Sequence, residues 1–176
     1  MADWERVLTT LVTERGDALK RYAFLLCGED ATAQDLVQDA LVRAIGRHRP
    51  FAGQDMVQVE AYVRRIIVNL SIDQNRSLSR WRRFLPLLAT PDQSPDPAAR
   101  IATTRDMHSA LRELSPRQRA CVVLRYYEDL PIADIASALG CSDGTVKRHL
   151  SEATNRLAAS FGPSQEGRSW PSTRKR

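Results

Sequence analysis

The sequence predicts an all-α chain made of two small helical domains that a proline-rich, extended linker joins. Hydrophobic residues recur three and four positions apart in several long stretches, which is the spacing of one helix face. Aromatic residues make up only 6% of the 176 residues and glycine occurs only 8 times, a composition that disfavours β-sandwiches and barrels. Four of the nine prolines fall between Pro86 and Pro97. Because proline lacks an amide donor and disfavours helix in the residue before it, this segment separates the two helical parts.

The N-terminal part, residues 1–85, is expected to contain three helices. The first runs from about Trp4 to Cys27. A capping box at residues 32–35 is expected to start the second, and the segment 47–55 is predicted to be a loop because it contains proline and glycine. The apolar stripes of the second and third helices comprise Leu36, Val37, Ala40, Leu41, Ala44 and Ile45, and Val59, Tyr62, Val63, Ile66, Ile67 and Leu70.

After the linker, residues 86–104, the C-terminal part (residues 105–161) is expected to contain four helices. The first covers residues 106–114. Ser115 is placed to cap the second, with Pro116 at its first helical position. The third ends at Gly140 and Ser142 caps the fourth, whose apolar side comprises Val146, Leu150, Ala153 and Leu157. The remaining residues, 162–176, are expected to form a flexible basic tail.

Three residues near the third and fourth of these helices are typical of a helix-turn-helix. Ala136 is small enough for two helices to approach closely, Gly140 suits the tight turn, and Val146 is an apolar anchor for the second helix. With Val146 facing the core, helical geometry turns a polar set outward, flanked by Lys147 and Glu152. That outward set is Gly144, Arg148, Ser151 and Asn155. Such a face can bind base edges and phosphates in the major groove.

Charge is unevenly distributed along the N-terminal part. Residues 1–39 hold eight acidic side chains against four basic ones, whereas residues 40–85 hold nine arginines against three acids. This polarity suggests two partners, one of them a polyanion. On the helical wheel Arg65, Asn69 and Arg76 lie within about 40° of one another. Further basic and aromatic residues, Arg80, Trp81, Arg82, Arg83 and Phe84, are expected to follow the end of the helix, and such a mixture suits single-stranded nucleic acid.

Other classes of protein find little support. The three cysteines form no C-x-x-C pair and no histidine lies at ligand spacing from them, so neither a metal nor a disulfide framework is expected. No phosphate loop, catalytic triad or carboxylate cluster stands out, so neither an enzyme nor a cofactor is predicted. No apolar run reaches the length a bilayer needs, which predicts a cytoplasmic protein without membrane insertion. A two-domain helix-turn-helix transcriptional regulator that acts on its own stays open as one interpretation of these patterns.

Four segments together resemble bacterial RNA polymerase sigma factors of the extracytoplasmic-function group. Residues 22–43 are similar to the helices of that group that bind core polymerase, and residues 61–69 to its helix that reads the −10 element. Residues 114–126 and 132–147 are similar to its domain that reads the −35 element. The resemblance extends over about residues 5–160 in the right order, and it is strongest toward the actinobacterial sigma-E-like members.

The resemblance implies a sigma factor that binds core polymerase and directs promoter-specific initiation. The clamp helices of the largest subunit would contact Asp35, Gln38, Asp39 and Arg43. The melted −10 element would contact Arg64, Arg65, Asn69, Arg76 and Arg80, together with the loop from Arg49 to Gln58. The −35 duplex would contact Thr145, Lys147, Arg148, Ser151 and Asn155. Further implied partners are the β flap of the polymerase and an anti-sigma factor, and the linker would thread toward the RNA exit path.

Overall fold

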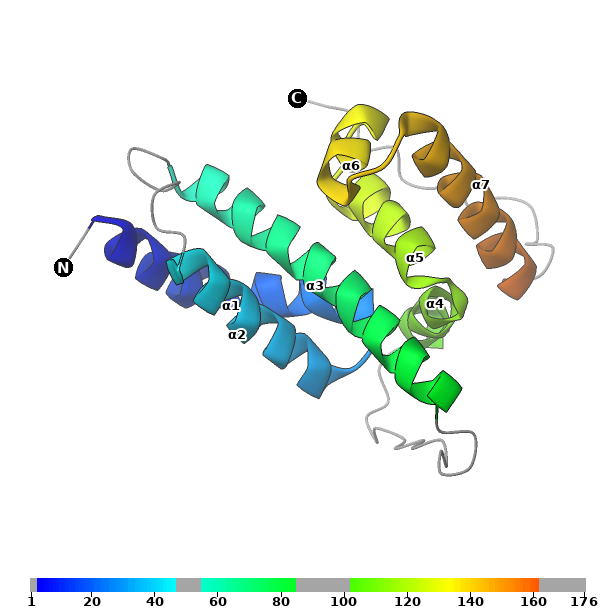
Figure 1. The fold of residues 1–176 in the computed structure, drawn as a ribbon, viewed down its shortest axis with the longest axis horizontal. Helices are drawn as coiled ribbons and strands as arrows, with labels where there is room; N and C mark the ends of the chain where they lie inside the picture. Colours follow the sequence, from blue (N-terminus) through cyan, green and yellow to red (C-terminus); the bar gives the residue numbers. More distant parts are fainter. Residues whose placement is uncertain (1–2, 47–54, 85–101, 162–176) are drawn as a thin grey trace.

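Figure 1 shows a computed structural model of the chain, which describes residues 3–46, 55–84 and 102–161. Three long helices form one group, α1 (Asp3–Cys27), α2 (Asp30–Gly46) and α3 (Met56–Phe84). The second group comprises α4 (Ala102–Glu113), α5 (Pro116–Val122), the π-helical segment η2 (Val123–Tyr127), α6 (Ile132–Leu139) and α7 (Asp143–Ser160). The described residues contain no strand, so the all-α prediction is confirmed. Among them, no helix combines the length and the apolar character that crossing a membrane requires.

The N-terminal domain is a bundle in which α1, α2 and α3 each pack against the other two. Its core comprises Leu11, Leu19 and Tyr22 of α1, Leu36, Ala40 and Ala44 of α2, and Val59, Val63 and Ile67 of α3. The first helix ends at Cys27, and the amide of the next residue, Gly28, donates to the Phe24 carbonyl at 2.7 Å. Gly28 has φ +79°, a left-handed conformation that glycine adopts without steric cost.

Two local predictions for α2 are wrong. The helix begins at Asp30, and the Glu29 carbonyl accepts its first helical hydrogen bond, so Thr32 lies within the first turn and its hydroxyl donates to the Glu29 carboxylate instead of capping. Ile45, expected on the apolar stripe, is 45% exposed. Its neighbour Val42 is 67% exposed, so the last turns of α2 present two apolar side chains outward.

The third helix is longer than the sequence indicated. Because α3 continues to Phe84, Arg80 and the following arginines lie on the helix and not beyond it, which corrects the prediction. α3 also has a second buried face that the single stripe did not predict, formed by Val68, Ser71 and Ile72, with the half-buried Arg64 on the same side. This face follows helical spacing, and Arg64 on it reaches the C-terminal domain.

The C-terminal domain confirms most of its predicted local signals. Ser115 and Gln118 form a reciprocal capping box at the start of α5, with Pro116 in the first turn. Ser142 caps α7 by accepting a hydrogen bond from the Thr145 amide at 3.3 Å. Helix α4 begins at Ala102, earlier than predicted and inside the segment assigned to the linker. The other residues of that segment, residues 47–54 of the loop predicted over 47–55, and the predicted tail at 162–176 lie outside the described residues.

The predicted helix-turn-helix is present in α6 and α7. Gly140 has φ +60° between the two helices, and the Cys141 amide donates to the Ala136 carbonyl at 3.0 Å. Val146 is fully buried and Ala136 nearly so, as the spacing predicted. The turn therefore fixes α7 on α6 with one face of α7 directed away from the core.

The two domains share one hydrophobic core. Side chains of α1 and α3 join a cluster with residues of the C-terminal domain, namely Ala120, Cys121, Val123, Leu124, Ile135, Ala136, Leu139 and Val146. In Figure 1 the C-terminal half of α3 lies beside α5, and these helices pack against each other. The described helices therefore form one body, because α3 buries one face in each domain.

Candidate nucleic-acid and partner interfaces

The exposed face of α2 carries the residues predicted to bind core polymerase. Asp35, Gln38, Asp39 and Arg43 are all exposed, while Leu36 between them is fully buried. The exposed Val42 and Ile45 lie along the same helix. Exposed apolar side chains with polar groups at their rim are typical of a protein-binding surface.

The residues predicted to read the −10 element lie on α3 but in different surroundings. Asn69 and Arg65 are exposed, and Arg65 Nη2 donates to the Ser137 carbonyl of α6 at 2.8 Å. Arg64 is largely buried. Arg76 and Arg80 lie on the helix, and their side chains belong to the part that the structure does not describe.

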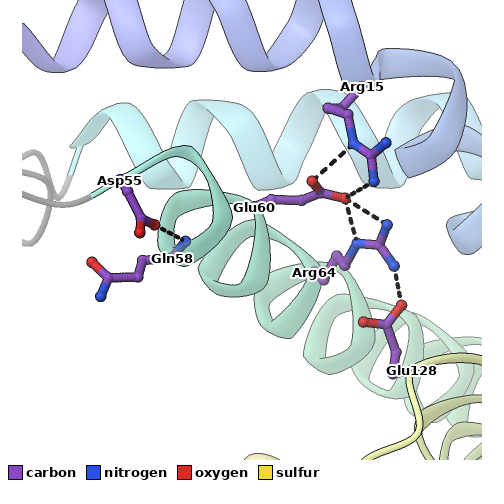
Figure 2. Close-up of polar contacts among 6 residues, drawn as sticks. All are labelled: Arg15, Asp55, Gln58, Glu60, Arg64 and Glu128. Carbon is purple, nitrogen blue, oxygen red and sulfur yellow. Dashed lines mark hydrogen bonds and ion pairs between the residues drawn. The ribbon is translucent and has the colours of Figure 1, made fainter. Parts of the chain in front are cut away.

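Arg64 is the centre of a charge network that joins the two domains (Figure 2). Glu60 accepts from Arg15 Nε at 3.0 Å and from Arg64 Nη2 at 2.5 Å. The remaining edge of the Arg64 guanidinium donates to Glu128, immediately after η2. The side chains of Arg64 and Glu128 are only 13% and 19% exposed. Two guanidiniums and two carboxylates thus alternate from α1 through α3 to the C-terminal domain.

Two tyrosine rings flank the same guanidinium. The Arg64 Cζ atom lies 5.1 Å from the centre of the Tyr22 ring and 5.9 Å from that of Tyr127. The two rings are themselves 6.0 Å apart. Burial, followed by the charge of Glu128, raises the pKa of Tyr22, so its hydroxyl stays neutral. Arg64 therefore combines ion pairs with cation–π contacts, which strengthen when water is excluded.

Arg119 makes a second polar connection between the domains. Its guanidinium is buried and donates to the backbone carbonyls of Leu26 at 2.9 Å, Arg112 at 3.0 Å and Leu114 at 3.3 Å. Leu26 lies in the last turn of α1, and the other two carbonyls lie at the end of α4. One side chain thus satisfies the terminal carbonyls of two helices that belong to different domains. Burial lowers the pKa of Arg119.

The end of α1 touches α4 at two further points. The Phe24 ring meets the His108 ring edge-on, with centres 4.7 Å apart. A Cβ atom on Gly28 would lie 2.8 Å from Cγ of Arg112. Burial lowers the pKa of His108, which favours the neutral imidazole. The contact between α1 and α4 is therefore close.

The face of α7 opposite Val146 is accessible. Lys147, Arg148, Ser151 and Asn155 are exposed, as predicted from helical geometry. Thr145 is half-buried and its hydroxyl lies 2.9 Å from that of Ser142, so this side chain takes part in the cap. Glu152 accepts from Gln118 Nε2 at 2.8 Å. The structure thus brings four of the five predicted −35 residues to one open face.

Comparison with known proteins decides between the classes of DNA-binding protein. Residues 11–82 match the model of sigma-70 region 2, and residues 104–157 match that of sigma-70 region 4. An RNA polymerase sigma-E factor of Streptomyces avermitilis is 38% identical over 147 residues, which cover 83% of this chain and 80% of the relative. The chain belongs to the sigma-70 family. It is a sigma factor that directs promoter-specific transcription initiation.

The sigma factor also has relatives of the extracytoplasmic-function (ECF) group. The ECF RNA polymerase sigma factor SigL of Mycobacterium tuberculosis is 34% identical over 155 residues, or 86% of each chain. A solved structure of the sigma factor RpoE of Bartonella quintana, in complex with the anti-sigma factor NepR, matches with a TM-score of 0.65 and 26% identity. That match covers 88% of this chain and 96% of RpoE. Sigma factors are initiation factors and not enzymes, and the alternative of a regulator without polymerase is not favoured.

Sequence reasoning missed the residues that join the domains of the sigma factor. Glu60 and Arg64 are four positions apart on one helix, a spacing that does indicate an ion pair. Glu128 and Arg119 gave no comparable signal, because their partners in the N-terminal domain, Arg64 and Leu26, lie 64 and 93 positions away. The three cysteines are free thiols.

The charge network is expected to make the stability of the sigma factor depend on pH. Burial alone would raise the pKa of Glu60, but Arg15 and Arg64 outweigh it and hold the pKa below its ordinary 4.5. The folded state therefore keeps Glu60 ionised at a pH where the unfolded state binds a proton. The stability that ionised Glu60 contributes is complete above about pH 4.5 and is lost as the pH falls through its folded pKa.

At pH 6 we expect the free energy of unfolding to be larger for the wild-type protein than for the variant Glu60→Gln. We expect this difference to become smaller as the pH falls below about 4.5. Urea unfolding followed by circular dichroism at pH 6, 5, 4 and 3.5 measures it. Glu14→Gln, at an exposed position of α1, controls for the loss of one carboxylate. A difference for Glu60→Gln that stays constant with pH would contradict the role of the network.

Proposed function

We propose that three helix faces divide the work of this sigma factor. The exposed face of α2 binds the clamp helices of core polymerase through Asp35, Gln38, Asp39 and Arg43. α3 grips the melted −10 element through Arg64, Arg65, Asn69, Arg76 and Arg80. α7 reads the −35 duplex through Thr145, Lys147, Arg148, Ser151 and Asn155, while the domain around it contacts the β flap.

The geometry of α7 is the observation that carries this proposal. Val146 anchors the helix in the core, and the exposed residues Arg148, Ser151 and Asn155 follow at spacings of three and four. A helix with this arrangement can enter the major groove with several polar side chains in reach of base edges. Lys147 adds a charge for the phosphate backbone.

Two further assignments follow from the chemistry of the family. The sigma factor contributes no catalysis of its own, since the polymerase forms the phosphodiester bonds, and it acts in the cytoplasm, where polymerase and promoters are. An anti-sigma factor is a further proposed partner, supported by the likeness to RpoE in complex with NepR.

Run-off transcription tests the proposal directly. Purified protein, core RNA polymerase from a Streptomyces species and a genomic promoter library are combined, and the RNA ends are sequenced. Transcripts that require the protein and share two spaced upstream motifs are the expected result. Binding of duplex DNA by the protein alone, without transcripts, would instead favour a conventional regulator.

Substitutions in α7 and α3 are expected to affect promoters differently. Arg148→Ala should change the preference at −35 positions, because a bidentate contact to a base discriminates by roughly 1–3 kcal/mol. Arg65→Ala should weaken most promoters alike, because a phosphate contact carries no sequence information. Transcription from a promoter library by both variants measures the two effects. An equal loss at all −35 sequences for Arg148→Ala would contradict the assignment of that residue.

A further inference from the structure

A relay of polar contacts connects the start of α5 with the exposed face of α7. Gln118 is 5% exposed, and its side-chain Oε1 accepts from the Ser115 amide at 3.1 Å. Its Nε2 donates to Oε2 of Glu152 on α7 at 2.8 Å. The other oxygen of Glu152, Oε1, lies 3.9 Å from Nη1 of Arg148, one helical turn earlier. The relay therefore links the capping box of α5 to the residue that the proposed function places on a base.

The chemistry of the relay fixes the orientation of its central amide. The Ser115 N–H can only donate and the Glu152 carboxylate can only accept, so a single orientation of the Gln118 amide satisfies both neighbours. Because Gln118 is buried and bonded at both ends of its amide, it holds the Glu152 carboxylate against α5. The relay thereby confines a long side chain of α7 that would otherwise sample several rotamers.

We propose that Gln118 and Glu152 are positioning residues that orient Arg148 toward a guanine of the −35 element. This inference rests on the proposed function of Arg148 in reading that element. With Nη1 directed to Glu152, the guanidinium keeps the edge formed by Nε and Nη2 free. Two N–H groups on one edge match the O6 and N7 acceptors of guanine in the major groove. The relay thus selects which edge of Arg148 faces the DNA.

The pair of Arg148 and Glu152 acts on orientation and contributes little to the stability of the free protein. The two side chains are 65% and 44% exposed, and water screens a pair that is so exposed. When α7 enters the major groove, water is displaced and the Coulomb attraction within the pair increases. An unpaired carboxylate on this face would repel phosphates, but Glu152 is bonded to Gln118 and faces a cation. The relay thus accounts for an acidic residue on a helix that binds a polyanion.

The test exchanges donors and acceptors along the relay in the full-length protein. Gln118→Glu keeps an acceptor for the Ser115 amide, since glutamate takes the same place in capping boxes, but sets a second carboxylate against Glu152. Glu152→Gln accepts from Gln118 through its amide oxygen and so turns its NH2 group toward Arg148. In the double variant Gln118→Glu/Glu152→Gln the new amide donates to the new carboxylate and offers its oxygen to Arg148. The double variant therefore restores both contacts with their polarity exchanged.

Run-off transcription with core polymerase, from a promoter library with randomised −35 elements, measures the base preference of each variant. Arg148→Ala first identifies the −35 positions whose preference depends on Arg148. At such a position a bidentate contact discriminates about tenfold, and one remaining hydrogen bond of the two leaves about threefold. We expect each single variant to show this reduction with unchanged −10 preference, and the double variant to recover the wild-type preference.

Two controls accompany the variants of the relay. Asp134→Asn removes one negative charge at an exposed position of α6 in the same domain, and it should leave the −35 preference unchanged. Circular dichroism reports whether Gln118→Glu, at a buried position, impairs folding. If it does, Glu152→Gln, at a half-buried position, tests the relay by itself.

The possible outcomes separate this inference from the proposed function. Wild-type −35 preference in both single variants would overturn the positioning role, while an effect of Arg148→Ala would leave the proposed function standing. An equal loss at all −35 sequences, or a new preference at a position that Arg148→Ala leaves unchanged, would also overturn it. The first of these would reduce the relay to a stabilising contact, and the second would show that Glu152 itself contacts a base. If Arg148→Ala leaves every −35 preference unchanged, the proposed function of Arg148 fails and the inference fails with it.

Discussion

Reversing two charges on α2, in the variant Asp35→Arg/Asp39→Arg, is expected to weaken binding to core RNA polymerase about 100-fold. Charge pairs across protein interfaces carry coupling energies of about 1.5–7 kcal/mol, so about 3 kcal/mol for two reversals is a conservative figure. Both carboxylates are exposed, and the described part of the chain offers neither of them an ion pair. The fold should therefore tolerate the change while promoter-dependent transcription is lost.

The matched control is Glu14→Arg/Asp17→Arg on α1. These two residues are also exposed and one helical turn apart, so the control alters net charge by the same amount on a different face. Fluorescence anisotropy of labelled protein titrated with core polymerase measures both affinities. Equal loss in the two variants would show that net charge, and not the α2 face, governs binding.

The second large effect concerns stability. Replacing Arg119 by leucine is expected to lower the free energy of unfolding by about 3 kcal/mol, because three buried or partly buried carbonyls lose the guanidinium that donates to them. Exchanging a complete buried ion pair for apolar residues can be neutral. Here the acceptors are backbone groups that remain after the substitution, so the loss is not compensated.

Arg117→Leu provides the control for Arg119→Leu. Arg117 lies in the same helix and is half-buried, and no hydrogen bond of its guanidinium occurs among those of the described residues. Urea unfolding measures both variants, and we expect Arg117→Leu to stay within about 0.5 kcal/mol of wild type. A loss below about 1 kcal/mol for Arg119→Leu would mean that water replaces the guanidinium at these carbonyls.

The pH-dependent stability that Glu60 contributes and the stabilisation by Arg119 both arise at the interface between the two domains. Glu60 forms an ion pair with Arg64, which also contacts Glu128. Arg119 instead donates hydrogen bonds to carbonyls at the ends of α1 and α4. The first connection is a charge network that can exchange partners with water, and the second satisfies fixed backbone groups. We therefore expect Arg119 to contribute more to the free energy of unfolding than the charge network does.

Sequence patterns predicted what depends on neighbours along the chain. The Ser115 capping box, the Ser142 cap, and the spacing of Ala136, Gly140 and Val146 all involve residues at most ten positions apart. Backbone geometry within one or two turns decides whether such caps and turns form. The structure confirms each of them. The prediction at Thr32 was wrong because the chain turns at Gly28 and the helix starts directly after Glu29.

The sequence by itself thus determined the all-α class, the helix-turn-helix and the family of this protein. Only the tertiary structure decided which faces of the two domains meet. A helical pattern shows that Val68 and Ile72 are apolar, but not that they join one core with residues of α5. Arg64 and Glu128 are 64 positions apart, and Arg119 is 93 positions from Leu26. Such pairs are chosen by the shape and polarity of two complete surfaces, and no local spacing along the chain encodes that choice.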